Sequence, residues 1–304
     1  MKKASCIAFG MFDGVHMGHQ AIIESLCAEA RNNGLAPVIV KLMCTPESEN
    51  CHKQLTTDDE AAPLLRRQGL EVIPIPINGA VSQMSAEQFV KEVLVDRYNA
   101  KMIVAGSNIR FGKGKLGGVG SLRTLAYKYD YRTVIVDALT EGDDPFSETV
   151  ISSPLIRDVL TEKDVQRANR LLTRPYALSG LVVGGRGLGR LANMPTANLL
   201  TLPNKFIPAY GVYATTTNVH GVDYPGLTHV GFKPTVDMPG NMTIEIHLLD
   251  FAGDLYNQQL KTELHMYIRE TRKFKNLDEV RAQIDRDEVV AREFFARQGN
   301  SLRT

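Results

Sequence analysis

Short apolar runs alternate with helical patterns through the first half of the chain, and this alternation limits the folds that it can adopt. Five runs have the length of buried strands, at residues 5–10, 37–43, 71–77, 101–106 and 132–139. Helical patterns separate them, the first at residues 19–33, where apolar residues recur on one face until Gly34. Strands that alternate with helices predict an α/β fold, in which helices flank a parallel sheet.

The second half is rich in strands, with no helical pattern between them. Four β-type runs stand between turns of Gly, Pro and Asn, at residues 177–185, 210–217, 243–251 and 260–268. They predict an antiparallel barrel or sandwich, and the charged amphipathic segment from Leu277 onward predicts a helix packed on it. Pro175 ends the last helical pattern of the first half, so we expect two domains, residues 1–175 and 176–304.

The charge balance argues against several classes of protein. Lys and Arg number 35 and Asp and Glu number 34, so the net charge is only +1. No global field draws such a chain onto nucleic acid or an anionic membrane, and any basic site must be local. The apolar run near the start is too short for a secretion signal, and no later run is long enough to cross a membrane. We therefore expect a cytoplasmic protein that acts on small molecules.

Residues 9–20, FGMFDGVHMGHQ, stand where the first strand gives way to the first helix. In a parallel sheet, ligands bind at this edge. His16 and His19 can donate hydrogen bonds there, and the free N–H groups at the start of the helix favour a phosphate. Either histidine alone is better explained by capping or packing. The combination with glycines that let the backbone approach a ligand indicates a nucleotide site, which includes Gly10, Gly14 and Gly18.

Two further segments, 106–117 and 151–160, fall at the same predicted edge. The first is a glycine-rich loop after a strand, and the second carries two serines before a helix that begins at Pro154. Either segment alone is as well explained by a solvated loop or a capped helix. Together they offer amide, hydroxyl and guanidinium groups for a triphosphate, from Asn108, Arg110, Lys113, Ser152, Ser153 and Arg157.

The second half offers oxygen donors and a carboxylate. Thr196 and Asn198 share one face of an extended segment, and their oxygens suit Mg²⁺. Glu245 lies on a strand with apolar neighbours, where a carboxylate can take the proton of an attacking hydroxyl. The glycine-rich segment 180–190 leaves room for phosphates. Turns explain these glycines equally well, and a charged side chain is common on the solvated face of a strand.

The motifs of both halves resemble one enzyme family. HxGH followed by ISSxxxR is similar to the nucleotidyltransferases, and FDGVHMGHQ with RFGKG and ISSPLIR resembles the adenylyltransferase module of the bacterial bifunctional riboflavin kinase/FAD synthetases. GRLANMPTANL, IPAYGVYA, GFKPT and EIHLLDFAGDLY follow in the order of that family's flavokinase module. The resemblance implies a Rossmann-like nucleotidyltransferase domain, followed by an antiparallel β-barrel flavokinase domain with a C-terminal helix.

The resemblance also implies two reactions and the residues that serve them. Riboflavin would be phosphorylated to FMN with ATP and Mg²⁺, and FMN would be adenylylated to FAD with release of pyrophosphate. Glu245 would be the base of the kinase, Thr196 and Asn198 would bind Mg²⁺, and His16 and His19 would stabilise the phosphates of ATP. The remaining positions are, for ATP and its phosphates, Gly10, Asp13, Gly14, Gly18, Ser152, Ser153, Arg157, Gly180, Gly185, Gly189 and Arg190, and for the flavin, Asn108, Arg110 and Arg269.

Three departures from the family pattern concern the first half. Met11 stands where Asn is usual, Pro154 stands where Thr is common, and KLMCTPES replaces the usual TFxPHP loop. Two alternatives to the two-step enzyme therefore stay open. One is a riboflavin kinase with a weakened or altered nucleotidyl-transfer module, and the other is a flavin- or nucleotide-binding regulator without catalysis.

Overall fold

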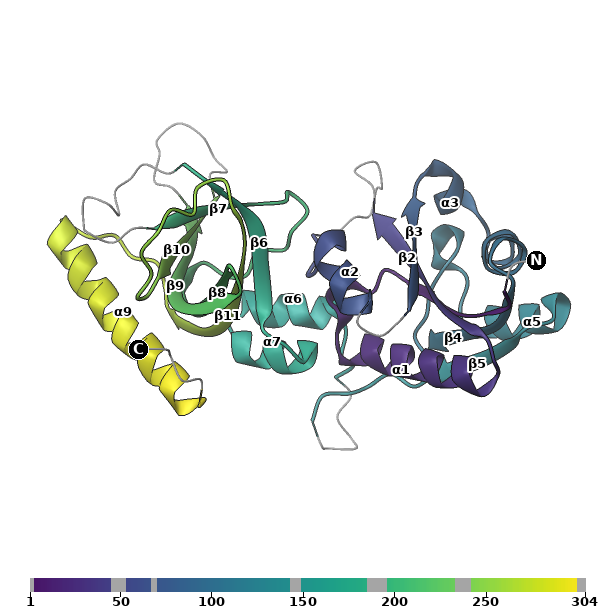
Figure 1. Cartoon of the computed structure of the whole chain (residues 1–304). Coiled ribbons are helices and arrows are strands. Elements are labelled where there is room, and N and C mark those ends of the chain that lie inside the picture. The colour runs from purple at the N-terminus through teal and green to yellow at the C-terminus, as the bar shows by residue number, and fades with distance from the viewer. Residues whose placement is uncertain are drawn as a thin grey trace. The chain divides into compact units, whose positions relative to one another are not determined.

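The computed structural model describes residues 3–44, 53–66, 70–142, 149–184, 196–232 and 242–299. Contacts divide the chain into two compact units, Met1–Leu155 and Ile156–Thr304. Figure 1 shows a sheet with helices in the first and a barrel in the second. Each unit therefore has its own core and is described by itself.

The first unit contains a five-stranded sheet whose neighbouring strands are all parallel. Its spatial order is β3-β2-β1-β4-β5, so β1 lies at the centre. The strands are β1 (Ser5–Gly10), β2 (Ala36–Cys44), β3 (Glu71–Ile77), β4 (Ala100–Gly106) and β5 (Arg132–Val136). All five predicted strands are confirmed, and Pro74 and Pro76 are tolerated because β3 is an edge strand.

Helices connect the strands of this sheet. They are α1 (Met17–Asn32), α2 (Asp58–Arg66), α3 (Gly79–Gln83), α4 (Ala86–Gln88), which continues into the π-helical stretch η2 (Phe89–Arg97), and α5 (Val119–Tyr129). Thr57 and Glu60 form the predicted capping box of α2, since each side chain meets the backbone N–H of the other. A second capping box, Ser85 with Gln88, opens α4.

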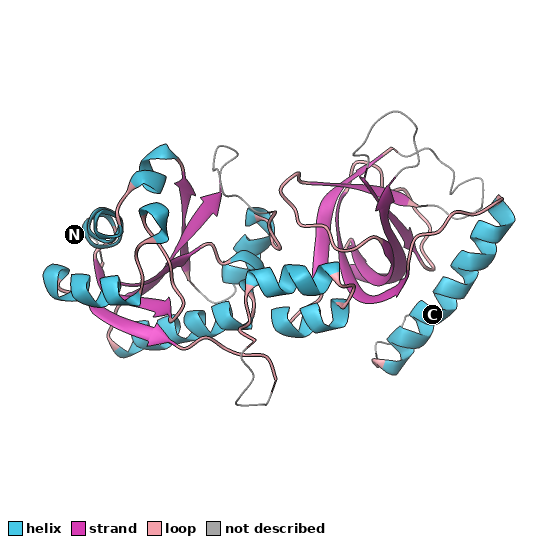
Figure 2. Cartoon of the chain, turned by 180° about the vertical axis from the view of Figure 1, so that it is seen from behind, coloured by secondary structure: helices cyan, strands magenta, loops and turns pink. Residues whose placement is uncertain are grey.

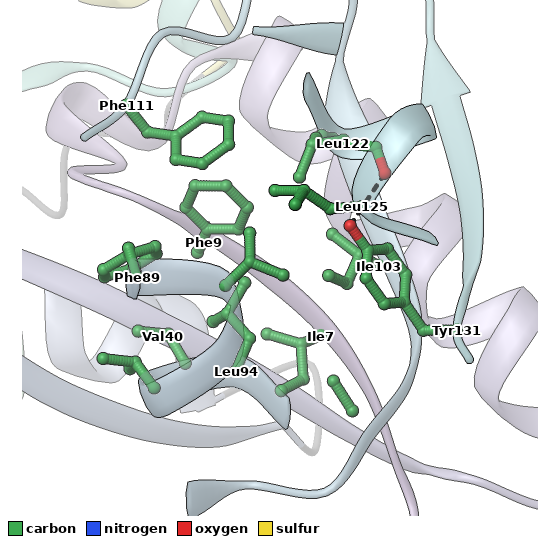
Figure 3. Packing of buried hydrophobic residues seen from close by; sticks show 14 of the residues in the cluster. Ile7, Phe9, Val40, Phe89, Leu94, Ile103, Phe111, Leu122, Leu125 and Tyr131 are labelled. Carbon is green, nitrogen blue, oxygen red and sulfur yellow. Dashed lines mark hydrogen bonds between the residues drawn. The ribbon is translucent and has the colours of Figure 1, made fainter. Parts of the chain in front are cut away.

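Side chains alternate between the two faces of the sheet, and each face is buried by its own helices. Cys6, Ala8 and Ile39 pack with residues of α1 and α2. On the opposite face, Phe9 meets Phe89 and Phe111 at ring-centroid distances of 5.4 and 5.1 Å (Figure 3). At the border of this second cluster, the buried Tyr131 hydroxyl donates to the Leu122 carbonyl at 2.7 Å. Burial on both faces fixes β1, and therefore the loop that follows it.

The second unit contains a closed six-stranded antiparallel barrel in the order β10-β7-β6-β11-β8-β9. The strands are β6 (Tyr176–Val183), β7 (Ala197–Thr201), β8 (Gly211–Val219), β9 (Val222–Phe232), β10 (Met242–Leu248) and β11 (Gln259–Arg269). The barrel confirms one of the two predicted architectures. The sequence analysis missed β7 and β9 as strands, because neither shows a long run of alternating apolar residues.

Among the described residues, three helices accompany the barrel: α6 (Ser153–Thr161), which crosses the division between the units, α7 (Val165–Leu172) and the predicted C-terminal helix α9 (Leu277–Arg297). Figure 2 shows α9 running along the outside of the barrel, and it contacts β8, β9 and β11. Phe295 is fully buried there, and Arg292 makes a two-pronged ion pair with Asp250. Inside the barrel, the buried hydroxyls of Thr215 and Thr228 lie 3.0 Å apart and satisfy each other.

We expect Phe89→Ala to destabilise the first unit by roughly 3–5 kcal/mol, because it removes a ring that packs on two others and leaves a cavity. Chemical denaturation of the full chain measures this loss. Tyr127→Ala is the matched control, since the Tyr127 side chain is 95% exposed. Equal losses for the two variants would contradict the packing described above.

Candidate active sites

The connection from β1 to α1 begins at the carboxyl end of the central strand. It contains the 3₁₀ turn η1 (Asp13–Val15). Phe12, just before the turn, and Val15, its last residue, have φ values of 49° and 43°. A left-handed backbone is costly for a β-branched residue such as Val15. Both side chains are buried against the sheet, which holds the strained loop in place. The loop therefore has a fixed shape before any ligand binds.

His16 and His19 lie together where this loop enters α1. Their rings are stacked, with centroids 3.8 Å apart and planes at 22°, and Phe12 lies 5.2 Å from His19. Gly18 makes this arrangement possible, because a Cβ there would come within 3.3 Å of the His16 ring. His16 occupies the N-cap position of α1, and in the described structure no side chain caps that end of the helix. The N–H groups of the first turn therefore face the same region as the two rings.

Burial determines the charge of His19. Desolvation holds the pKa of His19 well below its usual range, and the neighbouring His16 lowers it further. The Nδ1 atom of His19 is buried, with no hydrogen-bond partner among the described residues. A neutral, incompletely bonded imidazole at a helix N-terminus can hydrogen-bond a phosphate oxygen.

A cavity of about 290 Å³ opens beside the pair. It brings together segments 9–22, 105–110 and 136–139 with residues 151–154, all from the first unit. The predicted site residues that line it are Gly10, His16, Gly18, His19, Asn108, Arg110, Ser152 and Ser153. The sequence analysis missed Asp137 and Leu139, which it assigned to a strand. The structure ends β5 at Val136, so these two residues follow a parallel strand at the ligand-binding edge.

Several polar groups at this edge hold the loop together. The Asp13 carboxylate accepts a hydrogen bond from the Thr56 N–H at 3.1 Å, and its carbonyl accepts one from the Ser153 hydroxyl at 2.9 Å. The Ser152 hydroxyl accepts a hydrogen bond from the Leu155 N–H at 3.4 Å. This bond is the one expected if the segment simply caps a helix. The two bonds of Asp13 join segments that are far apart in the sequence.

The three cationic residues predicted for this site have different positions. Lys113 is exposed at the start of the 3₁₀ turn η3 (Lys113–Lys115) and is not among the residues that line the cavity. Arg110 is exposed at the cavity, where its guanidinium donates to the Ile109 carbonyl at 2.8 Å. Gly14, with a φ of 82°, is buried in the turn before His16. Arg157 lies further along α6, in the second unit, and is not among the residues that line the cavity.

A second group of site residues lies on the barrel, where the register of β10 brings them together. Glu245 pairs with Asn198 on β7 and with His229 on β9. Residues directly opposite one another on antiparallel strands share a face, with Cβ atoms about 5 Å apart. Thr196 comes two residues before Asn198, just ahead of β7. The amide of Asn198 and the carboxylate of Glu245, predicted from separate motifs, thus meet on one surface of the barrel.

Two predicted residues of the second unit have contacts of their own. A side chain at Gly180 would overlap the Leu200 carbonyl, so the close approach of β6 and β7 itself requires a glycine there. The Arg269 side chain donates from Nε to both Asp287 oxygens, at 3.0 and 2.9 Å, and ties the end of β11 to α9. Gly185, Gly189 and Arg190 lie outside the described residues.

His229 is a residue of this surface that the sequence analysis missed. Burial lowers its pKa, while Glu245 acts to raise it and Arg269 lowers it. It could not be found from the sequence because β9 was not predicted as a strand. Only the pairing of β9 with β10 places it beside Glu245.

Family models match both units of the chain. A model described as FAD synthetase matches residues 1–150, and one described as riboflavin kinase matches residues 172–295. The matches lie where the sheet and the barrel are found.

Curated relatives extend the similarity over nearly the full length. The bifunctional riboflavin kinase/FMN adenylyltransferase of Escherichia coli K12 is 34% identical, over 97% of this chain and 94% of its own. The protein of the same name from Bacillus subtilis 168 is 32% identical, over 96% of this chain and 93% of its own.

A solved structure shares the fold of the chain. The crystal structure of a protein described as a macrolide-efflux protein, from Streptococcus pneumoniae, superposes with a TM-score of 0.83 at 28% identity. The match covers 96% of this chain and 97% of that one. Among the described residues of our chain, no helix has the length and apolar character needed to cross a membrane.

We expect acid to destabilise the folded chain partly through His19. Its pKa lies below the unfolded value of about 6.5, so under mildly acidic conditions the unfolded chain binds the extra proton and stability falls as the pH falls. The melting temperature of the wild type should therefore drop more steeply between pH 7 and pH 5.5 than that of His19→Gln. His220→Asn, a change at an exposed turn, controls for the loss of one histidine. Parallel curves for the wild type and His19→Gln would contradict the buried neutral state.

Proposed function

The chain belongs to the bifunctional riboflavin kinase/FMN adenylyltransferase family, and we propose that each unit performs one of the two reactions. The enzyme phosphorylates riboflavin to FMN and transfers the adenylyl group of ATP to FMN, which yields FAD and pyrophosphate. We assign adenylyl transfer to the cavity of the first unit and phosphoryl transfer to the barrel. The observation that carries this division is that each unit holds its own convergent group of polar side chains beside the matching family model.

In the first unit, the reaction is a direct displacement at the α-phosphate of ATP. The phosphate oxygen of FMN forms the new P–O bond, and the bond to the β-phosphate breaks as pyrophosphate leaves. The stacked pair of His16 and His19 and the N–H groups of α1 are placed to hydrogen-bond the triphosphate as charge moves onto the leaving group. Asn108 and Arg110 line the same cavity and are proposed to contact the flavin substrate.

In the barrel, Glu245 is the proposed base. Its carboxylate takes the proton of the riboflavin 5′-hydroxyl as that oxygen attacks the γ-phosphate of ATP, and ADP leaves. The oxygens of Thr196 and Asn198 fit Mg²⁺, which prefers hard oxygen ligands, and Asn198 lies directly opposite the base. Bound Mg²⁺ would neutralise phosphate charge in this reaction.

The alternatives left open by the sequence are not favoured. A regulator without catalysis has no use for Glu245, and a kinase without adenylyl transfer has no use for the His16–His19 pair. Met11 and Pro154 both line the cavity, and neither closes it. Pro154 stands in the first turn of α6, where proline is well tolerated.

We expect Glu245→Gln to lower kcat for riboflavin phosphorylation by about 10²–10⁴-fold, because the amide cannot take the proton. Adenylylation of supplied FMN should be unchanged, since that site is in the other unit. Glu263→Gln, on barrel strand β11, which pairs with β6 and β8 and not with β10, is the matched control and should keep both activities. A Glu245→Gln enzyme with more than a third of the wild-type kinase rate would refute the assignment of the base.

We expect His16→Asn to lower FMN adenylylation and to leave riboflavin phosphorylation unchanged, the opposite of Glu245→Gln. Asparagine is a favourable N-cap residue, so α1 should form normally while the imidazole is lost. FMN adenylylation should fall by about 10²–10³-fold, and riboflavin phosphorylation by the same preparation should not change. Loss of both activities together, or of neither, would argue against the proposed division.

A further inference from the structure

His229 lies directly opposite Glu245 on the outer surface of the barrel. The register of β9 with β10 pairs the two residues, and Asn198 flanks Glu245 on its other side. Neighbours in such a row have side chains within reach of each other. The imidazole is therefore next to the proposed base, on the side away from Asn198.

The His229 ring is held in one orientation by two contacts. A Cβ at Gly231 would come within 2.7 Å of the ring, so the ring packs on bare glycine backbone. The Nε2 atom lies 3.3 Å from the Thr271 hydroxyl, in the segment that follows β11. When that hydroxyl donates to Nε2, the proton of the neutral ring resides on Nδ1, and the ring keeps one N–H donor.

The charges around the ring come from three elements. Glu245 on β10 favours the protonated ring, and Arg269 at the end of β11 opposes it. Arg269 is itself paired with the buried Asp287 of α9, at 2.8 Å. Burial outweighs the attraction of Glu245 and lowers the pKa of His229 below its usual value. The ring is therefore neutral at pH 7.

We propose that His229 is a positioning residue for the riboflavin kinase reaction, in which its neutral ring, fixed by Gly231 and Thr271, orients the Glu245 carboxylate toward the hydroxyl that it deprotonates. The inference rests on the proposed role of Glu245 as the base. A protonated ring would place a full positive charge beside that carboxylate and weaken it as a proton acceptor. The kinase rate should therefore also fall at low pH, where His229 becomes protonated.

Three variants of the full-length enzyme test this proposal. His229→Leu removes both ring nitrogens at similar volume, whereas His229→Gln keeps a polar group that can reach Thr271. Thr271→Val removes the hydroxyl that fixes the ring. His220→Leu, at the turn of the same hairpin between β8 and β9, is the matched control. For each enzyme, kcat and KM for riboflavin are measured from pH 5.5 to 8, with FMN adenylylation and the melting temperature alongside.

We expect His229→Leu to lower kcat about tenfold, a modest part of a base's full effect, with little change in KM for riboflavin. His229→Gln should restore most of the rate and lose less activity than the wild type between pH 7 and 5.5. Thr271→Val should also lower kcat. The double variant His229→Leu/Thr271→Val should be little slower than His229→Leu alone, because both changes act through one ring. Adenylylation should stay unchanged throughout.

A wild-type kcat in His229→Leu would overturn the proposal. So would equal losses in His229→Leu and His229→Gln together with a lowered melting temperature, since that result describes a structural role only. If His229→Leu fails to fold, the kcat and pH profile of Thr271→Val decide in the same way. Glu245→Gln is assayed in the same series. Full kinase activity of Glu245→Gln would refute the role of Glu245 as the base. Loss of kinase activity in Glu245→Gln, together with wild-type activity in His229→Leu, would refute only the role of His229.

Discussion

The hydrogen-bond register between strands is the constraint on which both candidate sites depend. In the barrel, β10 pairs with β7 on one side and β9 on the other, and this alone sets Asn198, Glu245 and His229 in one row. A slip of one residue would turn Glu245 toward the interior. In the sheet, parallel pairing of β1 with β4 brings the loop after Gly10 to the same edge as the loop after Gly106. Closure of the barrel and burial of both faces of the sheet make such slips costly.

Each site keeps polar groups in a poorly solvated environment, which is unfavourable for folding and useful for catalysis. His19 is neutral because it is buried, and the left-handed residues Phe12 and Val15 hold the His16–His19 pair at the start of α1. The surrounding apolar packing offsets these costs, as it does for strained loops at many functional sites. The chain therefore arranges its donors before the nucleotide arrives, and little reorganisation remains for the reaction itself.

Local patterns explain how much the sequence could predict. The parallel strands were predicted because they are short apolar runs, which the fold buries on both faces, and α9 was predicted because it buries a periodic apolar face. The His16 and His19 pair was predicted from its place between a strand and a helix. Contacts that link distant segments could not be predicted: the bonds of Asp13 to Thr56 and Ser153, the pair of Arg269 with Asp287, and His229 beside Glu245. Each depends on tertiary geometry that leaves no local signature.

The most direct test of the whole account is a time course with the purified wild-type enzyme, riboflavin, ATP and Mg²⁺, in which riboflavin, FMN and FAD are separated and quantified. FMN should appear first and FAD should follow as FMN is consumed, because one chain carries both reactions. Accumulation of FMN without any FAD, even when FMN is supplied directly, would contradict it. The cavity around His16 and His19 would then have to serve a different purpose.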